Sequence, residues 1–159
     1  MLNDSEKEFE RKYNLQLIAM LGHGKDGRVW ESDRHTALKF FYDFDVYTRE
    51  LRAYRILRSV RRDDFLGHQV PRLLNNDDSL HAIEMTIVAP PFLLDFAAAY
   101  MEKEVERFAF HPDVIAEREN HWAEIFEAHW PEVMAIREAF FLQTGLILLD
   151  LSLNNVRFE

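Results

Sequence analysis

An aspartate and an asparagine near the end of the chain have types and a spacing that could do chemistry. In the segment LLDLSLNNVRFE, residues 148–159, Asp150 lies between leucines and Asn155 follows five residues later. An apolar setting disfavours an ionised carboxylate unless hydrogen bonds or a metal ion compensate. An acid in such a setting, followed by an asparagine, raises the question of phosphoryl transfer. The alternatives are structural: Asp150 can hold a loop by accepting backbone N–H groups, and Asn155 can be a turn residue.

Three of the five glycines lie close together in the segment LGHGKDGRV, as Gly22, Gly24 and Gly27, with Val29 two residues further on. The same spacing marks dinucleotide-binding folds, but there a helix follows it. Here a strand pattern follows, which predicts the tip of a hairpin. Such glycines let the backbone approach phosphates closely, with N–H groups turned toward the anion. An ordinary glycine-rich hairpin turn is the alternative.

Two further charged residues are predicted to point inward. Lys39 lies in the apolar segment TALKF, where an ammonium group is costly unless a phosphate or a carboxylate faces it. At about 100° per residue, Glu50 falls on the apolar arc of a helical segment, together with Leu57 and Tyr54. Lys39 is the nearest inward cation for this glutamate. The alternatives are a lysine whose ammonium reaches water and a glutamate at the rim.

The elements that position these residues are predicted in the order sheet first, helices second. The predicted strands are residues 15–21, RVWES, HTALKFF, PRLLN and LHAIEMTIV. A helix with Asp45 as its N-cap is expected to run to about Val60. The segment APP, residues 89–91, indicates a hinge, and residues 92–143 have a helical pattern. Pro112 and Pro131 are expected at helix boundaries, and Gly145 at the end of the last helix.

The composition is that of one globular domain. The 159 residues are 48% hydrophobic and 30% charged, with a net charge of -9 and no cysteine. This acidity argues against a nucleic-acid partner, and the lack of cysteine excludes disulfides and thiolate chemistry. No apolar stretch reaches the ~20 residues that cross a bilayer, so no membrane is expected. The cytoplasm is the expected location.

Four segments together resemble the protein-kinase fold and its bacterial small-molecule-kinase relatives: GHGKDGRV, TALK, RELRAYRIL and DLSLNN. The resemblance implies an α+β fold. Residues 1–88 would form an N-lobe with an antiparallel five-stranded sheet and one packed helix. Residues 89–159 would form the hinge and a reduced, mostly helical C-lobe.

The resemblance also implies ATP and Mg²⁺ as cofactors and a protein or small-molecule hydroxyl as acceptor. The implied catalytic residues are Lys39, Glu50 and Asp150. The implied nucleotide contacts are Gly22, Gly24, Gly27, Val29 and Lys39. Asn155 would bind the metal.

The sequence departs from the family's pattern at the catalytic segment. Leu148 and Leu149 replace the usual His-Arg pair, and the sequence given stops before the Asp-Phe-Gly triplet whose aspartate chelates magnesium. The magnesium site is therefore expected to be incomplete. Three hypotheses remain open: an ATP-dependent kinase, a catalytically inactive pseudokinase that serves as a protein-binding scaffold, and a fragment of a longer protein.

The helical segment 113–143 is rich in aromatic residues. They are Trp122, Phe126, Trp130, Phe140 and Phe141. In the reduced C-lobe that the resemblance implies, these side chains would cover apolar surface or form a homodimer or partner interface. The alternative is an ordinary core, which is typical of aromatics at helical spacing.

Overall fold

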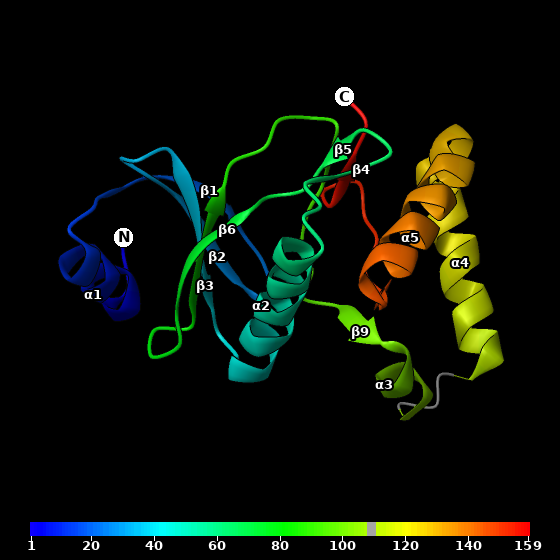
Figure 1. Cartoon of the computed structure of the whole chain (residues 1–159), viewed down its shortest axis with the longest axis horizontal. Coiled ribbons are helices and arrows are strands. Elements are labelled where there is room, and N and C mark those ends of the chain that lie inside the picture. The colour runs from blue at the N-terminus through cyan, green and yellow to red at the C-terminus, as the bar shows by residue number, and fades with distance from the viewer. Residues whose placement is uncertain (108–110) are drawn as a thin grey trace.

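The computed structural model describes residues 1–107 and 111–159. Its elements run from α1 at one end of the molecule to the α4–α5 pair at the other (Figure 1). In chain order they are α1 (Asp4–Tyr13), β1 (Leu17–His23), β2 (Gly27–Ser32), β3 (Thr36–Phe41), α2 (Phe44–Ser59), β4 (Asp64–Phe65), β5 (His68–Gln69), β6 (Leu73–Asp77), β7 (Ala82–Thr86), β8 (Phe92–Leu93), β9 (Ala99–Met101), α3 (Glu102–Arg107), α4 (Pro112–Phe126), the 3-10 helix η1 (Glu127–His129), α5 (Trp130–Thr144), β10 (Leu146–Leu148) and β11 (Val156–Arg157).

The main sheet has five antiparallel strands in the order β1-β2-β3-β7-β6. This confirms the predicted α+β class with an antiparallel five-stranded sheet. Strand β1 lies two residues later in the sequence than predicted, because its last residues pair with β2, Gly22 opposite Val29 and His23 opposite Arg28. The first two glycines are therefore at the end of a strand and the start of the turn that follows it.

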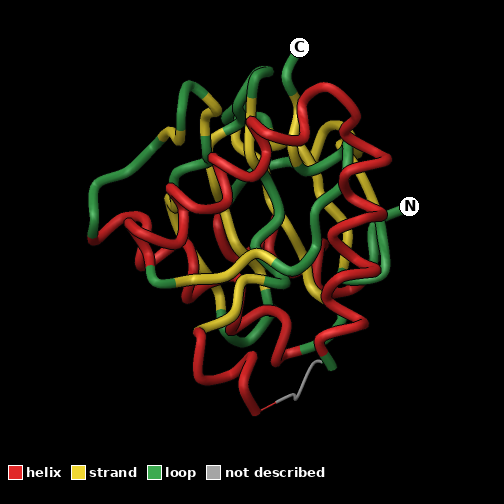
Figure 2. The backbone as a smooth tube through the Cα atoms, turned by 90° about the vertical axis from the view of Figure 1, so that its right-hand side faces the viewer, coloured by secondary structure: helices red, strands yellow, loops and turns green. Residues whose placement is uncertain are grey.

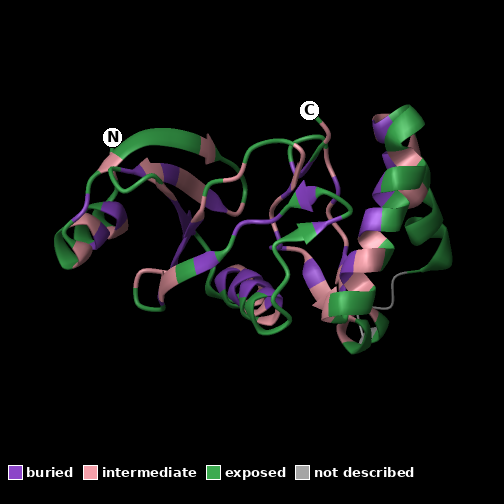
Figure 3. Cartoon of the chain, turned by 45° about the horizontal axis from the view of Figure 1, so that its top comes forward, coloured by how far each residue is buried: buried purple, intermediate pink, exposed green. Residues whose placement is uncertain are grey.

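Helix α2 packs beside the sheet, and Figure 3 shows much of it in the colour of buried residues. The predicted N-cap Asp45 is wrong by two residues. Asp43 caps the helix instead: its backbone is extended, and its carboxylate accepts a hydrogen bond from the Val46 N–H at 3.0 Å. Asp45 lies in the first turn, where a negative charge is favourable.

Helix α1 was not predicted, because its sequence is mostly polar. Its start carries a capping box in which Asn3 and Glu6 exchange hydrogen bonds, a signature readable as N-x-x-E. Glu6 is fully buried and also accepts the indole N–H of Trp30 at 2.8 Å. Phe9 packs edge-on against Phe40 of β3. The helix thus covers one face of the sheet.

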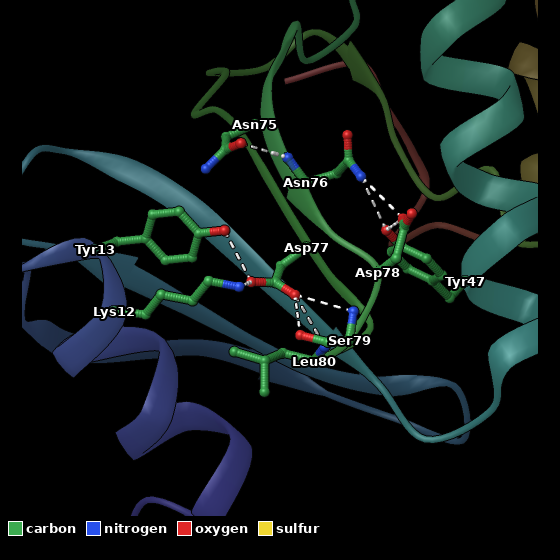
Figure 4. Close-up of polar contacts among 9 residues, drawn as sticks. All are labelled: Lys12, Tyr13, Tyr47, Asn75, Asn76, Asp77, Asp78, Ser79 and Leu80. Carbon is green, nitrogen blue, oxygen red and sulfur yellow. Dashed lines mark hydrogen bonds and ion pairs between the residues drawn. The ribbon is translucent and has the colours of Figure 1, made fainter.

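Asp77, at the end of β6, fastens α1 to the sheet (Figure 4). One carboxylate oxygen accepts hydrogen bonds from the Lys12 ammonium at 2.6 Å and the Tyr13 hydroxyl at 2.8 Å. The other accepts from the hydroxyl and backbone N–H of Ser79 and from the backbone N–H of Leu80. A single buried carboxylate therefore joins the helix to the β6–β7 turn.

The second half is less helical than predicted. Residues 92–101 contain the short strands β8 and β9, and part of the predicted helical run, residues 108–110, lies outside the described residues. The expected boundaries elsewhere are confirmed: Pro112 and Pro131 lie in the first turns of α4 and α5, and Gly145 ends α5 with a φ of 72°. Glycine, which lacks a Cβ, adopts that left-handed conformation more readily than other residues.

A second sheet has the strand order β11-β8-β5-β4. It joins residues from both sides of the predicted boundary between residues 88 and 89. In Figure 2, which views the molecule from the α4–α5 side, these helices lie in front of the strands. The division into two lobes stays a prediction.

The hydrophobic core runs from the main sheet through α2 to α4 and α5. Trp122, Phe126 and Phe140 are buried in it, so the core alternative is correct for these three aromatics. Phe140 stacks on Phe96 with ring centroids 5.3 Å apart. Trp130 and Phe141 are half-buried. Among residues 1–107 and 111–159, no helix combines the length and apolar character needed to span a membrane.

Candidate functional site

A cleft of about 730 Å³ lies between the β1–β2 hairpin, the segment after β7 and the loop before β11. All eight residues singled out in the sequence line it. They are Gly22, Gly24, Gly27, Val29, Lys39, Glu50, Asp150 and Asn155. A smaller pocket of about 380 Å³ lies along α2 and is lined by none of them.

Lys39 and Glu50 form a buried ion pair at the base of the cleft. Strand β3 supplies the lysine and helix α2 the glutamate, and Lys39 Nζ lies 2.6 Å from Glu50 Oε2. Both side chains are buried, with the glutamate 1% exposed. The predicted inward direction of both residues and their pairing are confirmed. Their part in binding or catalysis stays a prediction.

The charges around this pair keep the lysine protonated. Burial by itself lowers the pKa of Lys39, but the carboxylates of Glu50 and Asp95 outweigh it, so the pKa lies above its ordinary value. Burial raises the pKa of Glu50, Lys39 opposes the rise, and the charge of Asp95 adds to it. The base of the cleft therefore presents a fixed ammonium group.

Asp95 is a site residue that the sequence reasoning missed. It follows β8, and its Oδ1 lies 3.2 Å from Lys39 Nζ. The same oxygen accepts a hydrogen bond from the backbone N–H of Ala97 at 3.2 Å. Its φ is 65°, a conformation that aspartate and asparagine adopt more readily than most residues. The signal was present: like Asp150, it is an acid within an apolar stretch, FLLDF.

The three glycines differ in what holds them. A Cβ on Gly27 would lie 2.1 Å from the carbonyl oxygen of Phe40. The packing of β2 against β3 is therefore enough to require glycine at this position, whether or not a ligand binds. A Cβ on Gly22 or Gly24 would meet nothing within 4 Å. These two therefore leave room for a ligand's approach from the cleft.

The expected direction of the backbone N–H groups is wrong at one position. The N–H of Gly24 donates to the carbonyl oxygen of Gly27 at 3.0 Å and closes the turn. It is therefore directed within the hairpin and not toward an anion in the cleft. Lys25, next in the chain, supplies an exposed ammonium group at the tip.

Asp150 is not in the apolar environment that its neighbours in the sequence suggest. Leu148 and Leu151 turn into the core, whereas the Asp150 side chain is 43% exposed and lies 3.5 Å from Lys25 Nζ. The carboxylate therefore faces the cleft beside the Lys25 ammonium group. The alternative was that the Asp150 carboxylate holds a loop by accepting backbone N–H groups. Among the described residues, no backbone N–H donates to this carboxylate.

Asn155 is buried and takes part in a turn. Its N–H donates to the carbonyl oxygen of Ser152 at 3.1 Å, and its side-chain amide donates to the carbonyl oxygen of Asp150 at 3.4 Å. Its own carbonyl accepts the N–H of Leu94 at 2.7 Å, which fixes the loop beside Asp95. The turn alternative therefore describes its position, and metal binding stays a prediction.

The lining holds apolar surface, two ammonium groups and four carboxylates, and so offers places for an apolar part and an anionic part of a ligand. Leu21, Val29, Ala37, Met85 and Leu94 supply apolar surface, and Lys39 and Lys25 supply cationic groups. The volume is within the range of about 300–1,000 Å³ that is typical of small-molecule sites. A nucleoside triphosphate has this combination. The lining offers fewer ligands for magnesium than for the nucleotide. Within residues 1–107 and 111–159, no cluster of three or more His, Asp or Glu side chains is suited to hold a metal ion.

No protein-family model matches the chain. No curated protein sequence matches it either. Among solved structures, the chain is similar to the ternary complex of streptomycin, ATP and APH(2″)-IIa, an aminoglycoside phosphotransferase. The TM-score is 0.44 and the sequence identity 14%, over 56% of this chain and 30% of that chain. This chain thus spans less than a third of that neighbour.

Proposed function

We propose that the cleft binds a nucleoside triphosphate, ATP in the first instance, and that the protein is a kinase-like phosphotransferase. The observation that carries this proposal is the Lys39–Glu50 ion pair, 2.6 Å long and buried, at the base of a cleft whose other side is a glycine-containing hairpin. A buried ammonium fixed by a carboxylate is pre-organised for a phosphate oxygen. Residues 1–88 and 89–159 are proposed as the two lobes around it.

The parts of the nucleotide follow from the character of the lining. The base would lie against Val29, Ala37 and Met85, with the backbone of Ile87 and Val88 at the edge of its ring. The phosphates would lie beneath Gly22 and Gly24, where no Cβ blocks them, and reach Lys39. Glu50 would act as a positioning residue that holds the lysine.

The proposed chemistry is transfer of the γ-phosphoryl group to a hydroxyl of a protein or a small molecule. The acceptor oxygen bonds to the γ-phosphorus while the bond to the β–γ bridging oxygen breaks, and that oxygen leaves with the electron pair on ADP. The hydroxyl proton passes to the Asp150 carboxylate. When bound, magnesium would supply neutralisation of phosphate charge, and Asn155 is the proposed ligand on this chain.

Binding without transfer, as in a scaffold-type pseudokinase, is the second candidate. The contact between Lys25 and Asp150 favours it, because the carboxylate proposed to receive the hydroxyl proton lies 3.5 Å from an ammonium group of the same chain. A phosphate between the hairpin and Asp150 would attract Lys25 by charge and leave the carboxylate to the acceptor hydroxyl.

Titration calorimetry with ATP and magnesium tests the proposal. The unsubstituted protein is expected to bind, and Lys39→Ala to weaken binding by about tenfold or more. Because Lys39→Ala leaves Glu50 buried without its cation, the double variant Lys39→Met, Glu50→Gln is measured as well. Lys7→Ala, an exposed lysine far from the cleft residues in the sequence, is the matched control.

Asp150→Asn separates the two candidates. Transfer of labelled phosphate to an acceptor, lost in Asp150→Asn while ATP binding persists, supports the phosphotransferase. If the unsubstituted protein and Asp150→Asn both bind ATP and transfer phosphate to the same extent, the scaffold is favoured. Failure of the unsubstituted protein to bind ATP at all rejects the phosphotransferase and leaves the protein-binding scaffold.

A further inference from the structure

Two arginines of the helices α4 and α5 hold the backbone just before Asp150. Arg137 of α5 donates from Nε to the carbonyl oxygen of Leu148 at 3.1 Å. Arg118 of α4 donates to the carbonyl oxygen of Leu149 at 3.3 Å. The residues that line the cleft include Asp150 but neither arginine. The two arginines therefore act on the site through the backbone and not by touching a ligand.

The two guanidinium groups lie over the same buried ring, that of Trp122. The Cζ atom of Arg137 is 5.2 Å from the ring centroid and that of Arg118 is 6.0 Å from it. Burial lowers the pKa of Arg137, the Glu119 carboxylate opposes the fall, and the charge of Arg118 adds to it. Glu119 Oε1 lies 3.3 Å from Arg137 Nη1, and the indole face attracts both cations. These contacts offset the repulsion between the two arginines and hold both groups at the carbonyl oxygens of residues 148 and 149.

The first of these carbonyl groups belongs to the peptide unit between Leu148 and Leu149. A peptide unit is planar, so the carbonyl oxygen of one residue and the N–H of the next move together. Arg137 holds the oxygen of this unit. The carbonyl oxygen of Ala98 accepts its N–H, that of Leu149, at 3.0 Å. The unit is therefore held at both of its polar ends.

The second carbonyl group belongs to the peptide unit between Leu149 and Asp150, which contains the backbone nitrogen of the aspartate. Arg118 holds the oxygen of this unit. On the other side of the aspartate, its own carbonyl oxygen accepts the side-chain amide of Asn155 at 3.4 Å. The backbone of Asp150 is thus fixed before and after the residue, and this fixes where its carboxylate enters the cleft.

We propose that Arg118 and Arg137 are positioning residues for Asp150, which keep its carboxylate where an acceptor hydroxyl would meet it. The inference rests on the proposed function, in which Asp150 receives the hydroxyl proton, and adds the residues that hold this proton acceptor in place. A purely structural role, in which the arginines only fasten α4 and α5 to residues 148 and 149, predicts a loss of stability with no specific effect on transfer.

Three substitutions and a matched control separate these roles. Arg137→Gln removes the charge and the Nε donor, and Glu119, whose side chain is 41% exposed, is then left in contact with water. Arg137→Lys keeps the charge without the planar group that reaches two acceptors. Arg118→Gln removes the second contact. Arg34→Gln is the control, because Arg34 also donates to two successive carbonyl oxygens, those of residues 13 and 14 at the end of α1, at 2.7 and 3.1 Å.

The experiment measures ATP hydrolysis with excess magnesium, in which a water oxygen bonds to the γ-phosphorus, its proton passes to Asp150 and ADP leaves. Phosphate release gives kcat, and titration calorimetry gives the Kd for ATP. Arg137→Gln is expected to lower kcat by about 10- to 100-fold through misplacement of the carboxylate, with the Kd unchanged. Arg118→Gln should act in the same direction, and Arg137→Lys should recover part of the loss. Arg34→Gln should change neither quantity.

A double-mutant cycle shows whether the arginine acts through the aspartate. In the Asp150→Asn background, Arg137→Gln should cause no further loss of kcat, because residues that act as a unit are not additive. A loss in that background as large as in the unsubstituted protein would overturn the inference, since the arginine would then act elsewhere.

An unchanged kcat in both Arg137→Gln and Arg118→Gln would also overturn the inference, while hydrolysis by the unsubstituted protein would leave the proposed function standing. Absence of ATP binding or hydrolysis in the unsubstituted protein would instead reject the proposed phosphotransferase, and this inference with it. Thermal unfolding of each variant shows that the comparison is between folded proteins. If Arg137→Gln does not fold, Arg118→Gln, with the longer contact, takes its place in the cycle.

Discussion

At the scale of single residues, glycine spacing and side-chain charge carry different information. Gly22, Gly24 and Gly27 share one motif, yet a Cβ would clash at Gly27 alone, with the carbonyl oxygen of Phe40. Lys39 and Glu50 could be paired from the sequence because a buried charge requires a partner. Asp95 could not be assigned to the same ammonium, because its approach depends on a loop conformation 56 residues away in the chain.

Substitution of the glycines separates their packing role from their proposed ligand role. Gly27→Ala is expected to lower the free energy of unfolding by about 1–3 kcal/mol, since the new methyl group would overlap the backbone of β3. Gly24→Ala should leave it unchanged or raise it by up to about 1 kcal/mol, because alanine reduces the freedom of the unfolded chain. ATP affinity should fall in Gly24→Ala. Urea unfolding and calorimetry measure the two effects, and equal destabilisation by both substitutions would contradict this assignment.

At the scale of elements, sequence patterns predicted those that alternate clearly and missed those set by tertiary contacts. The five strands of the main sheet, helix α2 and the end of α5 at Gly145 follow from apolar periodicity and from the conformations open to glycine and proline. The short strands β8 and β9 have too few residues to show a period, and partners distant in sequence define them. Helix α1 depends on one capping box and on buried contacts of Glu6 with the sheet.

The junction between α1 and the sheet is expected to fail in acid. Burial raises the pKa of Asp77, but hydrogen bonds from Lys12, Ser79 and Tyr13 outweigh burial and hold it well below its usual range. An acid with a depressed pKa in the folded protein adds stability above its unfolded pKa of about 3.9, and that stability is lost as the pH falls further. Asp77→Asn should therefore cost about 2 kcal/mol at pH 7 and progressively less below pH ~4.

Urea unfolding between neutral and acidic pH measures this difference. Asp33→Asn, a substitution at an exposed position in the β2–β3 turn, is the control and should leave the pH profile unchanged. A cost for Asp77→Asn that stays constant down to pH ~2 would contradict the assigned charge state.

At the scale of the whole molecule, the main sheet contributes side chains to two hydrophobic clusters, one on each of its faces. Alternate residues of β3 enter different clusters: Leu38 and Phe40 face α1, whereas Ala37 and Phe41 face α2 and the core beyond it. The larger cluster continues to Phe140 in α5 and to Val156 in the last strand. Because no boundary divides this core, we expect residues 1–88 and 89–159 to unfold together.

Tryptophan fluorescence tests that expectation, because Trp30 lies in the cluster under α1 and Trp122 in the core of the helical end. Variants that keep one of the two, with the other tryptophans replaced by Phe, should show coincident urea transitions. Phe140→Ala should lower the free energy of unfolding by about 3–5 kcal/mol and move both transitions equally. A shift at Trp122 with Trp30 unmoved would show two independent units.

The steric position of Gly27 bears on how relatives of this chain would diverge. If a descendant lost its ligand, Gly22 and Gly24 would be free to drift to other residues, because no neighbour within 4 Å opposes a side chain there. Gly27 would persist, since the sheet would still select for it. In any such lineage, retention of the third glycine alone would indicate an intact hairpin, and retention of the first two would support the proposed ligand.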